Sequence, residues 1–222
     1  MITVHHLNNS RSQRVLWLLE ELELRYEVRR YERDKQTMLA PRELRTIHPL
    51  GKSPVITDNG RTIAETGAIV DYILERYGNG RLIPPAGTDD RLRYTYWLHY
   101  AEGSAMTPLL LKLLFLMIPR RAPPLMRPVM KVISKQLMTG VVDPRLKQHM
   151  AYWEEELGKS EWFCGNEFTA ADVQMSFPLE AAAARGGLED GHPKCMEFLK
   201  RIHARPAYHR ALVRGGPYAI GR

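Results

Sequence analysis

Strand-like and helix-like segments alternate only in the first 80 residues of this 222-residue chain. Apolar residues recur every second position in the expected strands and about every 3.6 positions in the expected helices, which gives the order β-α-β-α-β-β-α. The last two strands, VITD and RTIA, are joined by Asn59 and Gly60, a pair that favours a tight hairpin turn. Beyond residue 88 no segment alternates as a strand does. The sequence therefore predicts a small α/β domain followed by an all-helical domain.

The boundary between these two parts is expected in the linker RLIPPAGT, residues 81–88, which carries two prolines and a glycine. The α/β domain then covers residues 1–80 and the helical domain covers residues 89–222. A helical crossover makes the first two strands parallel, and the hairpin adds an antiparallel pair. In the helical part we expect four long stretches, the second interrupted near Gly140 and Pro144. These stretches are 89–118, 123–158, 169–185 and 193–214.

Composition excludes several classes of protein. With 44% hydrophobic residues the chain can bury a core, so disorder is not expected. Cys164 and Cys195 are the only cysteines and form no CxxC pair, which indicates neither a disulfide framework nor a metal site. The apolar run 105–118 is interrupted by Pro108 and Lys112 and is shorter than the roughly 18 residues of a membrane span. We expect a cytoplasmic protein without a transmembrane segment.

The net charge of +7 is concentrated in residues 112–147, which hold eight basic residues and one acid, Asp143. No zinc-finger spacing, RNA-recognition motif or basic tail accompanies them, so we expect no nucleic-acid partner. Four prolines within residues 119–128 predict a break between two helices. Three interpretations of the segment remain open. It is a solvated loop, a surface for membranes or polyanions, or a positive rim that attracts anionic substrates through Arg120, Arg121 and Arg127.

The stretch HPLGKSPV, residues 48–55, places Pro54 directly before an apolar strand, where proline supplies no N–H to the sheet. A trans bond before Pro54 is the commoner alternative, because only about 5–6% of X–Pro bonds in folded proteins are cis. A cis Ser53–Pro54 bond would instead turn the chain and expose the preceding backbone. An extended peptide can pair with such an edge as an added strand.

Charged and polar residues beside this edge suit a small peptide with two anionic ends. Glu65 and Thr66 begin the next helix, whose free N–H groups and dipole attract a carboxylate. The Glu65 side chain can accept from an ammonium group, so together they fit an α-amino acid end. Lys52, beside the exposed backbone, can hold a second carboxylate at the other end of the ligand.

Ser10 lies at or just before the start of the first helix, RSQRVLWLLEEL. One interpretation is that its hydroxyl caps the helix. The other is that the hydroxyl donates to a ligand thiolate, since helix N-termini lower the pKa of a thiol from about 8.5. The thiolate is the form that attacks electrophiles.

Four stretches together resemble the glutathione S-transferase family: SRSQRVLWLLEEL, HPLGKSPV, the acid–hydroxyl pair in AETGA, and FTAADV. The resemblance spans nearly the whole chain and is greater to bacterial and fungal members than to the tyrosine-dependent mammalian classes. It implies a thioredoxin-like first domain, a helical second domain, glutathione as co-substrate and a homodimer. The implied activity joins glutathione to a hydrophobic electrophile, with glutathione peroxidase as a side activity. A non-catalytic or regulatory glutathione-binding protein of the same fold is the alternative.

The resemblance also implies roles for individual residues. Pro54 matches the family's cis-proline. Ser53 matches the residue whose backbone pairs with the cysteinyl part of glutathione. Glu65 and Thr66 match the pair that binds the γ-glutamyl end. The implied glutathione-binding set is Lys52, Ser53, Pro54, Glu65 and Thr66.

For the chemistry itself, Ser10 is the expected catalytic residue, and Asn9 is the alternative, because some bacterial members use asparagine there. His5 and His6 lie roughly where other classes carry a tyrosine, although strand histidines are commonly only packed. The electrophile pocket is expected between the domains, with walls at Tyr96, Tyr100 and Met106. The T-x-x-D pattern in FTAADV is a helix capping box and is structural.

Overall fold

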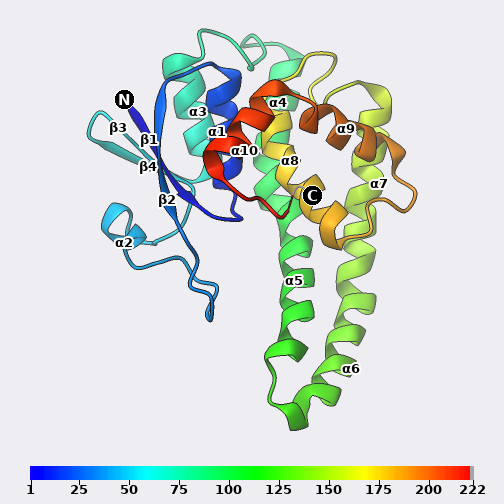
Figure 1. The fold of residues 1–222 in the computed structure, drawn as a ribbon. Coiled ribbons are helices and arrows are strands. Elements are labelled where there is room, and N and C mark those ends of the chain that lie inside the picture. Colours follow the sequence, from blue (N-terminus) through cyan, green and yellow to red (C-terminus); the bar gives the residue numbers. More distant parts are fainter. Residues whose placement is uncertain (221–222) are drawn as a thin grey trace.

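The structure is a computed structural model that describes residues 1–220. Its first 77 residues contain a four-stranded sheet and three helices in the predicted order (Figure 1). The elements are β1 (Ile2–Leu7), α1 (Ser12–Glu21), β2 (Tyr26–Tyr31), α2 (Leu44–Ile47), β3 (Val55–Asp58), β4 (Arg61–Ala64) and α3 (Thr66–Tyr77). The predicted α/β part is therefore confirmed, with the first helix beginning at Ser12 rather than Arg11.

The strands lie in the order β2-β1-β3-β4. β1 is parallel to β2 and antiparallel to β3, so that Val4 lies between Val28 and Ile56. β3 and β4 form the predicted hairpin. Asn59 and Gly60 both have positive φ angles, 47° and 77°, as a two-residue turn of this type requires.

Helix α1 lies at the centre of the molecule. Its residues from Ser12 to Leu19 are all buried, because the helix packs against β1 and α3 on one side and against the helical part on the other. Helix α10 (Pro206–Gly215) runs beside it (Figure 1). Arg205, just before α10, donates two hydrogen bonds to Glu21 at 2.6 and 2.9 Å. Helix α10 and Arg205 thus pack against the first helix.

The remaining elements are helical and match the predicted stretches with two differences. They are α4 (Asp89–Tyr100), η1 (Ala101–Ala105), α5 (Met106–Arg121), η2 (Pro124–Met126), α6 (Arg127–Leu137), η3 (Met138–Val142), α7 (Asp143–Lys159), α8 (Ala170–Arg185), α9 (Pro193–His203) and α10. Near Gly140 the chain forms a π-helical turn instead of the predicted break. The helix expected over 193–214 is divided before Pro206, because Arg205 is extended and proline lacks an N–H.

The capping box of FTAADV is confirmed at the start of α8. Thr169 is the N-cap, and its backbone N–H and hydroxyl donate to the Asp172 carboxylate at 2.8 and 3.0 Å. The Phe163 N–H donates to the other carboxylate oxygen at 2.9 Å, which ties the preceding loop to the helix. Burial raises the pKa of Asp172 to about 6.

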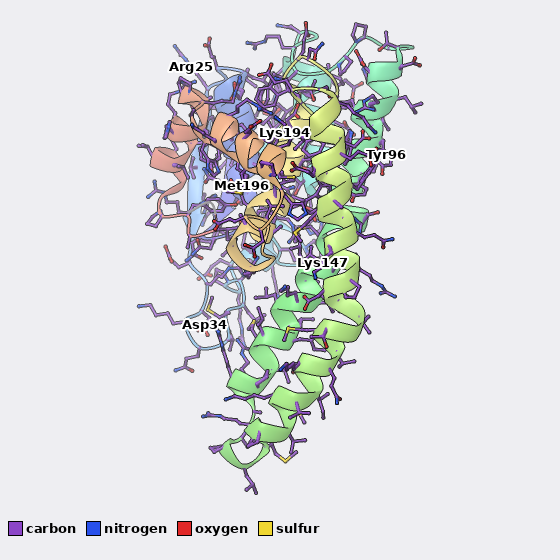
Figure 2. The ribbon with its side chains drawn as sticks, turned by 90° about the vertical axis from the view of Figure 1, so that its right-hand side faces the viewer. Arg25, Asp34, Tyr96, Lys147, Lys194 and Met196 are labelled. Atoms are coloured by element: carbon purple, nitrogen blue, oxygen red, sulfur yellow. The ribbon has the colours of Figure 1, made fainter. Side chains whose placement is uncertain are left out.

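The α5–α6 hairpin extends away from the rest of the molecule (Figures 1 and 2). The predicted break at the prolines is confirmed at its tip, between Arg121 and Arg127. The continuous helix 89–121 is long and apolar enough to cross a membrane by length and composition, with a mean hydropathy of 1.5 in an 18-residue window. Core helices meet the same criteria, and Tyr94, Trp97 and Leu98 in its first part are buried.

Candidate functional site

The peptide bond between Ser53 and Pro54 is cis, which confirms the less common alternative. Pairing between β1 and β3 stops at His5 and Val55. Beyond that point the Ser53 hydroxyl takes the place of the partner strand: it donates to the His5 carbonyl oxygen at 2.9 Å and accepts from the Leu7 N–H at 3.3 Å. Within residues 1–220 the Ser53 backbone forms no backbone hydrogen bond. The structure thus holds the loop in place while its main chain remains available.

A cavity of about 210 Å³ opens beside this bond. All five residues predicted to bind glutathione line it, although they come from the loop before β3 and from the start of α3. Five further residues complete the lining: Arg11, His48, Leu50, Ala64 and Glu102. Sequence reasoning missed these five.

Glu65 is the N-cap of α3 and has a φ of 69°, a backbone conformation that residues other than glycine rarely adopt. Such strain is maintained where surrounding structure or function requires it. The Glu65 side chain is exposed, and within the described part of the chain it forms no hydrogen bond or ion pair. It is thus free to bind a cationic group, next to the first N–H groups of α3.

Arg14 joins this pocket to the helical part. Its side chain is 2% exposed and donates to the Thr66 hydroxyl at 3.3 Å and to the Gln174 carbonyl oxygen at 2.6 Å. It also forms an ion pair with Glu102, which Arg11 contacts at 3.0 Å. Burial lowers the pKa of Arg14, and the Glu102 carboxylate opposes that shift. Glu102, from the helical part, therefore contacts both Arg14 of α1 and the N-cap residue Arg11, and Arg11 and Glu102 line the cavity.

One feature of the sequence could have identified Glu102. It is the single acidic residue between Asp90 and Asp143. An isolated carboxylate on an otherwise acid-free stretch of helix suggests a specific partner. The partners are 88 and 91 positions away in sequence, so helical periodicity alone does not identify them.

Ser10 does not line the cavity. It is 5% exposed, its hydroxyl accepts from the Ser12 N–H at 3.2 Å, and the two serine hydroxyls are 2.7 Å apart. The Ser12 hydroxyl in turn lies 2.9 Å from Nδ1 of His6. Burial lowers the pKa of His6 to about 4, so the imidazole is neutral. Ser10 is thus part of a buried hydroxyl–imidazole chain at the start of α1.

Asn9 also lies outside the lining of the cavity. Its φ is 48°, and its side-chain amide oxygen accepts from the Ala219 N–H at 2.7 Å, which fixes the orientation of the amide. The side-chain amide nitrogen donates no hydrogen bond among residues 1–220. The catalytic role of Ser10 or Asn9 stays a prediction.

The structure turns Tyr96 and Tyr100 toward α7 rather than toward the cavity. The Tyr100 hydroxyl contacts His149 and accepts from the Trp153 indole N–H at 3.1 Å. Tyr96 stacks on Tyr100 with ring centroids 5.4 Å apart. Met106 is 7% exposed and belongs to the core. The structure does not bring these three predicted pocket walls to the cavity.

The cysteines are not candidate nucleophiles. Cys164 and Cys195 are buried, and burial raises the pKa of the Cys164 thiol to about 12 and raises the pKa of Cys195 as well. A thiol with a raised pKa carries little thiolate at neutral pH. Among residues 1–220 there is also no group of three or more His, Cys, Asp or Glu side chains that could hold a metal ion.

Comparisons of the chain with known proteins identify one family. The N-terminal domain of glutathione S-transferases matches residues 1–75, and their C-terminal domain matches residues 126–209. Glutathione S-transferase 3 of Schizosaccharomyces pombe is 32% identical over 211 residues, covering 93% of this chain and 85% of that protein. Glutathione S-transferase 1 of Saccharomyces cerevisiae is 32% identical over 221 residues, covering 94% and 92%.

Solved structures agree. A glutathione S-transferase from Actinobacillus pleuropneumoniae superimposes with a TM-score of 0.81 at 31% identity and covers 100% of this chain and 96% of its own. A sphingomonad glutathione S-transferase, solved in complex with glutathione, has the same fold, with a TM-score of 0.73 at 23% identity over 96% of this chain and 98% of its own. With both domain models matched in order and full-length relatives above 30% identity, the chain belongs to the glutathione S-transferase family.

Proposed function

We propose that this chain, as a glutathione transferase, binds glutathione in the cavity at Ser53–Pro54 and joins its thiolate to hydrophobic electrophiles. The observation that carries the proposal is the gathering of five sequence-predicted residues around one cavity of about 210 Å³. A backbone edge, a helix N-terminus, an exposed carboxylate and a lysine meet there. Each has a complementary group in a γ-glutamyl tripeptide.

The bound position of glutathione follows from these groups. Its cysteinyl main chain pairs with the backbone of Ser53, as an added strand. The γ-glutamyl carboxylate lies at the N-terminus of α3 beside Thr66, where free N–H groups and the helix dipole favour an anion. The γ-glutamyl ammonium binds Glu65, and the glycyl carboxylate binds Lys52. The tripeptide then spans the cavity with its thiol toward the start of α1.

Activation of the thiol is assigned to Ser10, with Asn9 as the alternative. The Ser10 hydroxyl lies 2.7 Å from the Ser12 hydroxyl, which lies 2.9 Å from Nδ1 of His6. When the hydrogen bonds run from Ser10 to Ser12 to His6, Ser10 donates to a thiolate only after its hydroxyl rotates, whereas the opposite direction leaves its proton free. The Asn9 amide nitrogen needs no such change. In either case the thiolate sulfur forms a bond to the electrophilic carbon, and the leaving group departs with the electron pair.

We also infer a cytoplasmic homodimer, for which family membership is the support. Closed two-fold dimers are the commonest oligomers of soluble proteins. Binding and catalysis share the same residues, so the test below measures both.

The test compares two exposed glutamates that both have a positive φ angle. Glu65 and Glu23 are both exposed and have φ angles of 69° and 55°. Glu65→Gln should weaken glutathione binding by about ten- to a hundredfold, because a charge-assisted hydrogen bond contributes about 1.5–3 kcal/mol. Glu23→Gln should leave binding unchanged. Calorimetric titration measures affinity, and turnover with an aryl halide and with a hydroperoxide measures activity. Equal affinities for the two variants would remove Glu65 from the site, and binding without turnover would favour the non-catalytic alternative.

A further inference from the structure

The α5–α6 hairpin leaves the core of the protein soon after α5 begins. Among residues 110–141 only Ser134 is buried, although this stretch covers most of both helices. The hairpin extends beyond the other helices in both views (Figures 1 and 2). Its only polar contact with the α/β part among residues 1–220 is a hydrogen bond from Arg121 to the Thr37 carbonyl oxygen at 3.5 Å. Two neighbours of Thr37, Met38 and Leu39, are themselves exposed apolar residues.

The exposed surface of the hairpin is unusually apolar. It carries ten of the seventeen large hydrophobic side chains that are exposed in the described chain: Leu110, Leu114, Ile118, Leu125, Met126, Val129, Val132, Ile133, Leu137 and Val141. Leu125, at the tip, is 90% exposed, more than any other large hydrophobic residue in that set. Single exposed hydrophobic residues are ordinary, but many gathered on one hairpin indicate a surface that binds something.

The same surface is positively charged. No acidic residue occurs between Glu102 and Asp143, whereas that interval holds six basic residues. Lys112 pairs with Asp143 at 2.9 Å at the base of the hairpin. The other five are exposed and form no ion pair among residues 1–220: Arg120, Arg121, Arg127, Lys131 and Lys135.

The basic and the apolar side chains of α6 lie on different sides of the helix. Arg127, Lys131 and Lys135 recur every four residues and therefore share one side of the helix. Val129, Val132, Ile133 and Leu137 follow the spacing of a helical face and lie on the opposite side. A basic side and an apolar side on one exposed helix are typical of helices that lie in a membrane interface.

We propose that the tip of the α5–α6 hairpin docks on an anionic phospholipid surface. Leu125 and its apolar neighbours enter the boundary between headgroups and acyl chains, while Arg120, Arg121 and Arg127 bind lipid phosphates beside them. The cytoplasmic leaflet of a membrane supplies this negative surface. The proposal does not depend on the glutathione site, which lies at Pro54 and α3.

Charge complementarity favours a lipid surface over the two other occupants. A second copy placed hairpin to hairpin would set five unpaired positive charges against five more, with no acid to offset them. A nucleic acid would match the charge but would leave the ten apolar side chains in water. Both occupants are outcomes that the experiment below distinguishes.

Vesicle flotation tests the charge requirement. Arg120→Gln/Arg121→Gln/Arg127→Gln is compared with a control that loses the same charge elsewhere, Arg25→Gln/Arg61→Gln/Lys200→Gln, at three exposed residues outside every ion pair of the described chain. Arg25 lies at the end of the molecule away from the hairpin (Figure 2). With vesicles of phosphatidylcholine and phosphatidylserine in equal parts, the hairpin variant should bind about a hundredfold more weakly than wild type, and the control should bind within about threefold. None of the three proteins should bind strongly to vesicles of pure phosphatidylcholine.

Tryptophan fluorescence tests whether the tip enters the lipid. The four native tryptophans are at most 7% exposed, so their emission should not respond to vesicles. Leu125→Trp should shift its emission to shorter wavelength when anionic vesicles are added. Val213→Trp, at a position 79% exposed on α10, should not. An unshifted Leu125→Trp spectrum together with equal flotation of the two triple variants would overturn the proposal. So would a hairpin that instead binds an oligonucleotide, or a Leu125→Ser variant that changes oligomeric state while no vesicle binding is found.

Discussion

Glu65 and Glu102 build the candidate site in different ways at the level of single residues. Glu65 lines the cavity from a strained backbone position, and its side chain has no partner among residues 1–220, which suits a ligand contact. Glu102 contacts both Arg11 and Arg14 through one carboxylate oxygen and so helps to fix the wall of the cavity. Substitution of Glu65 should therefore weaken ligand binding directly, whereas substitution of Glu102 should act by displacing α1.

Ser10 and Asn9 can be separated by the pKa of the bound thiol. Replacing the residue that donates to the thiolate should raise that pKa by about one unit, the equivalent of one hydrogen bond of about 1.4 kcal/mol. Thiolate absorbance is followed against pH with glutathione bound to wild type, Ser10→Ala and Asn9→Ala. Ser12→Ala is the control for the hydroxyl chain, since Ser12 contacts His6 as well as Ser10. A shift in Asn9→Ala alone would assign the role to Asn9.

His6 should make folding sensitive to acid. Its pKa falls from 6.5 in the unfolded chain to about 4 when it is buried. Between these values the unfolded chain binds a proton at His6 and the folded chain does not, so stability is complete above pH 6.5 and is lost as the pH falls. The loss near pH 4 should be about 3 kcal/mol.

Urea unfolding of wild type and His6→Asn measures this loss, because asparagine keeps an acceptor for Ser12. The difference between the two proteins cancels groups that titrate in both. Asp172 is one of these, and its raised pKa acts in the opposite direction. A difference in stability that is the same at neutral pH and near pH 4 would show that His6 does not carry the effect.

At the scale of elements, the start of α8 is held by a buried cap and the start of α4 by an exposed one. Thr169 and Asp172 are buried, and their box also holds the Phe163 N–H. Thr88 accepts from the Arg91 N–H at 3.2 Å on the surface. Thr169→Ala should therefore lower the free energy of unfolding by about 2 kcal/mol and Thr88→Ala by about 0.5 kcal/mol. Thermal unfolding ranks them, and a larger effect at Thr88 would contradict this account of α8.

Element order was predictable because strands and helices leave different periods in a sequence. The hairpin at Asn59 and Gly60 and the cap at Thr169 follow from local chemistry, so short motifs were enough. At Pro54 local chemistry favoured a trans bond, and the resemblance to a known family was needed to favour the cis bond. The faces of the helices were not predictable in this way. Periodicity put Tyr96 and Tyr100 on one side of a helix, but only tertiary packing decides that this side meets α7. The same limit applies to Arg11 and Glu102.

At the scale of the whole molecule, α1 connects the two halves and the α5–α6 hairpin extends away from them. A homodimer is the expected assembly. Sedimentation equilibrium at micromolar concentration should give twice the chain mass of 25.6 kDa, and the same result should hold after Leu125→Ser, because the hairpin tip is assigned to lipid. A mass of one chain would contradict the dimer.

The central claim is that glutathione binds where the cis bond at Pro54 meets the N-terminus of α3. A crystal structure of the protein soaked with glutathione tests this most directly. The account predicts the cysteinyl backbone paired with Ser53, the γ-glutamyl ammonium on Glu65 and its carboxylate on the N–H groups of α3. Glutathione bound elsewhere, for example in the larger groove of about 1170 Å³ along residues 80–91, with the cavity at Pro54 empty, would contradict it.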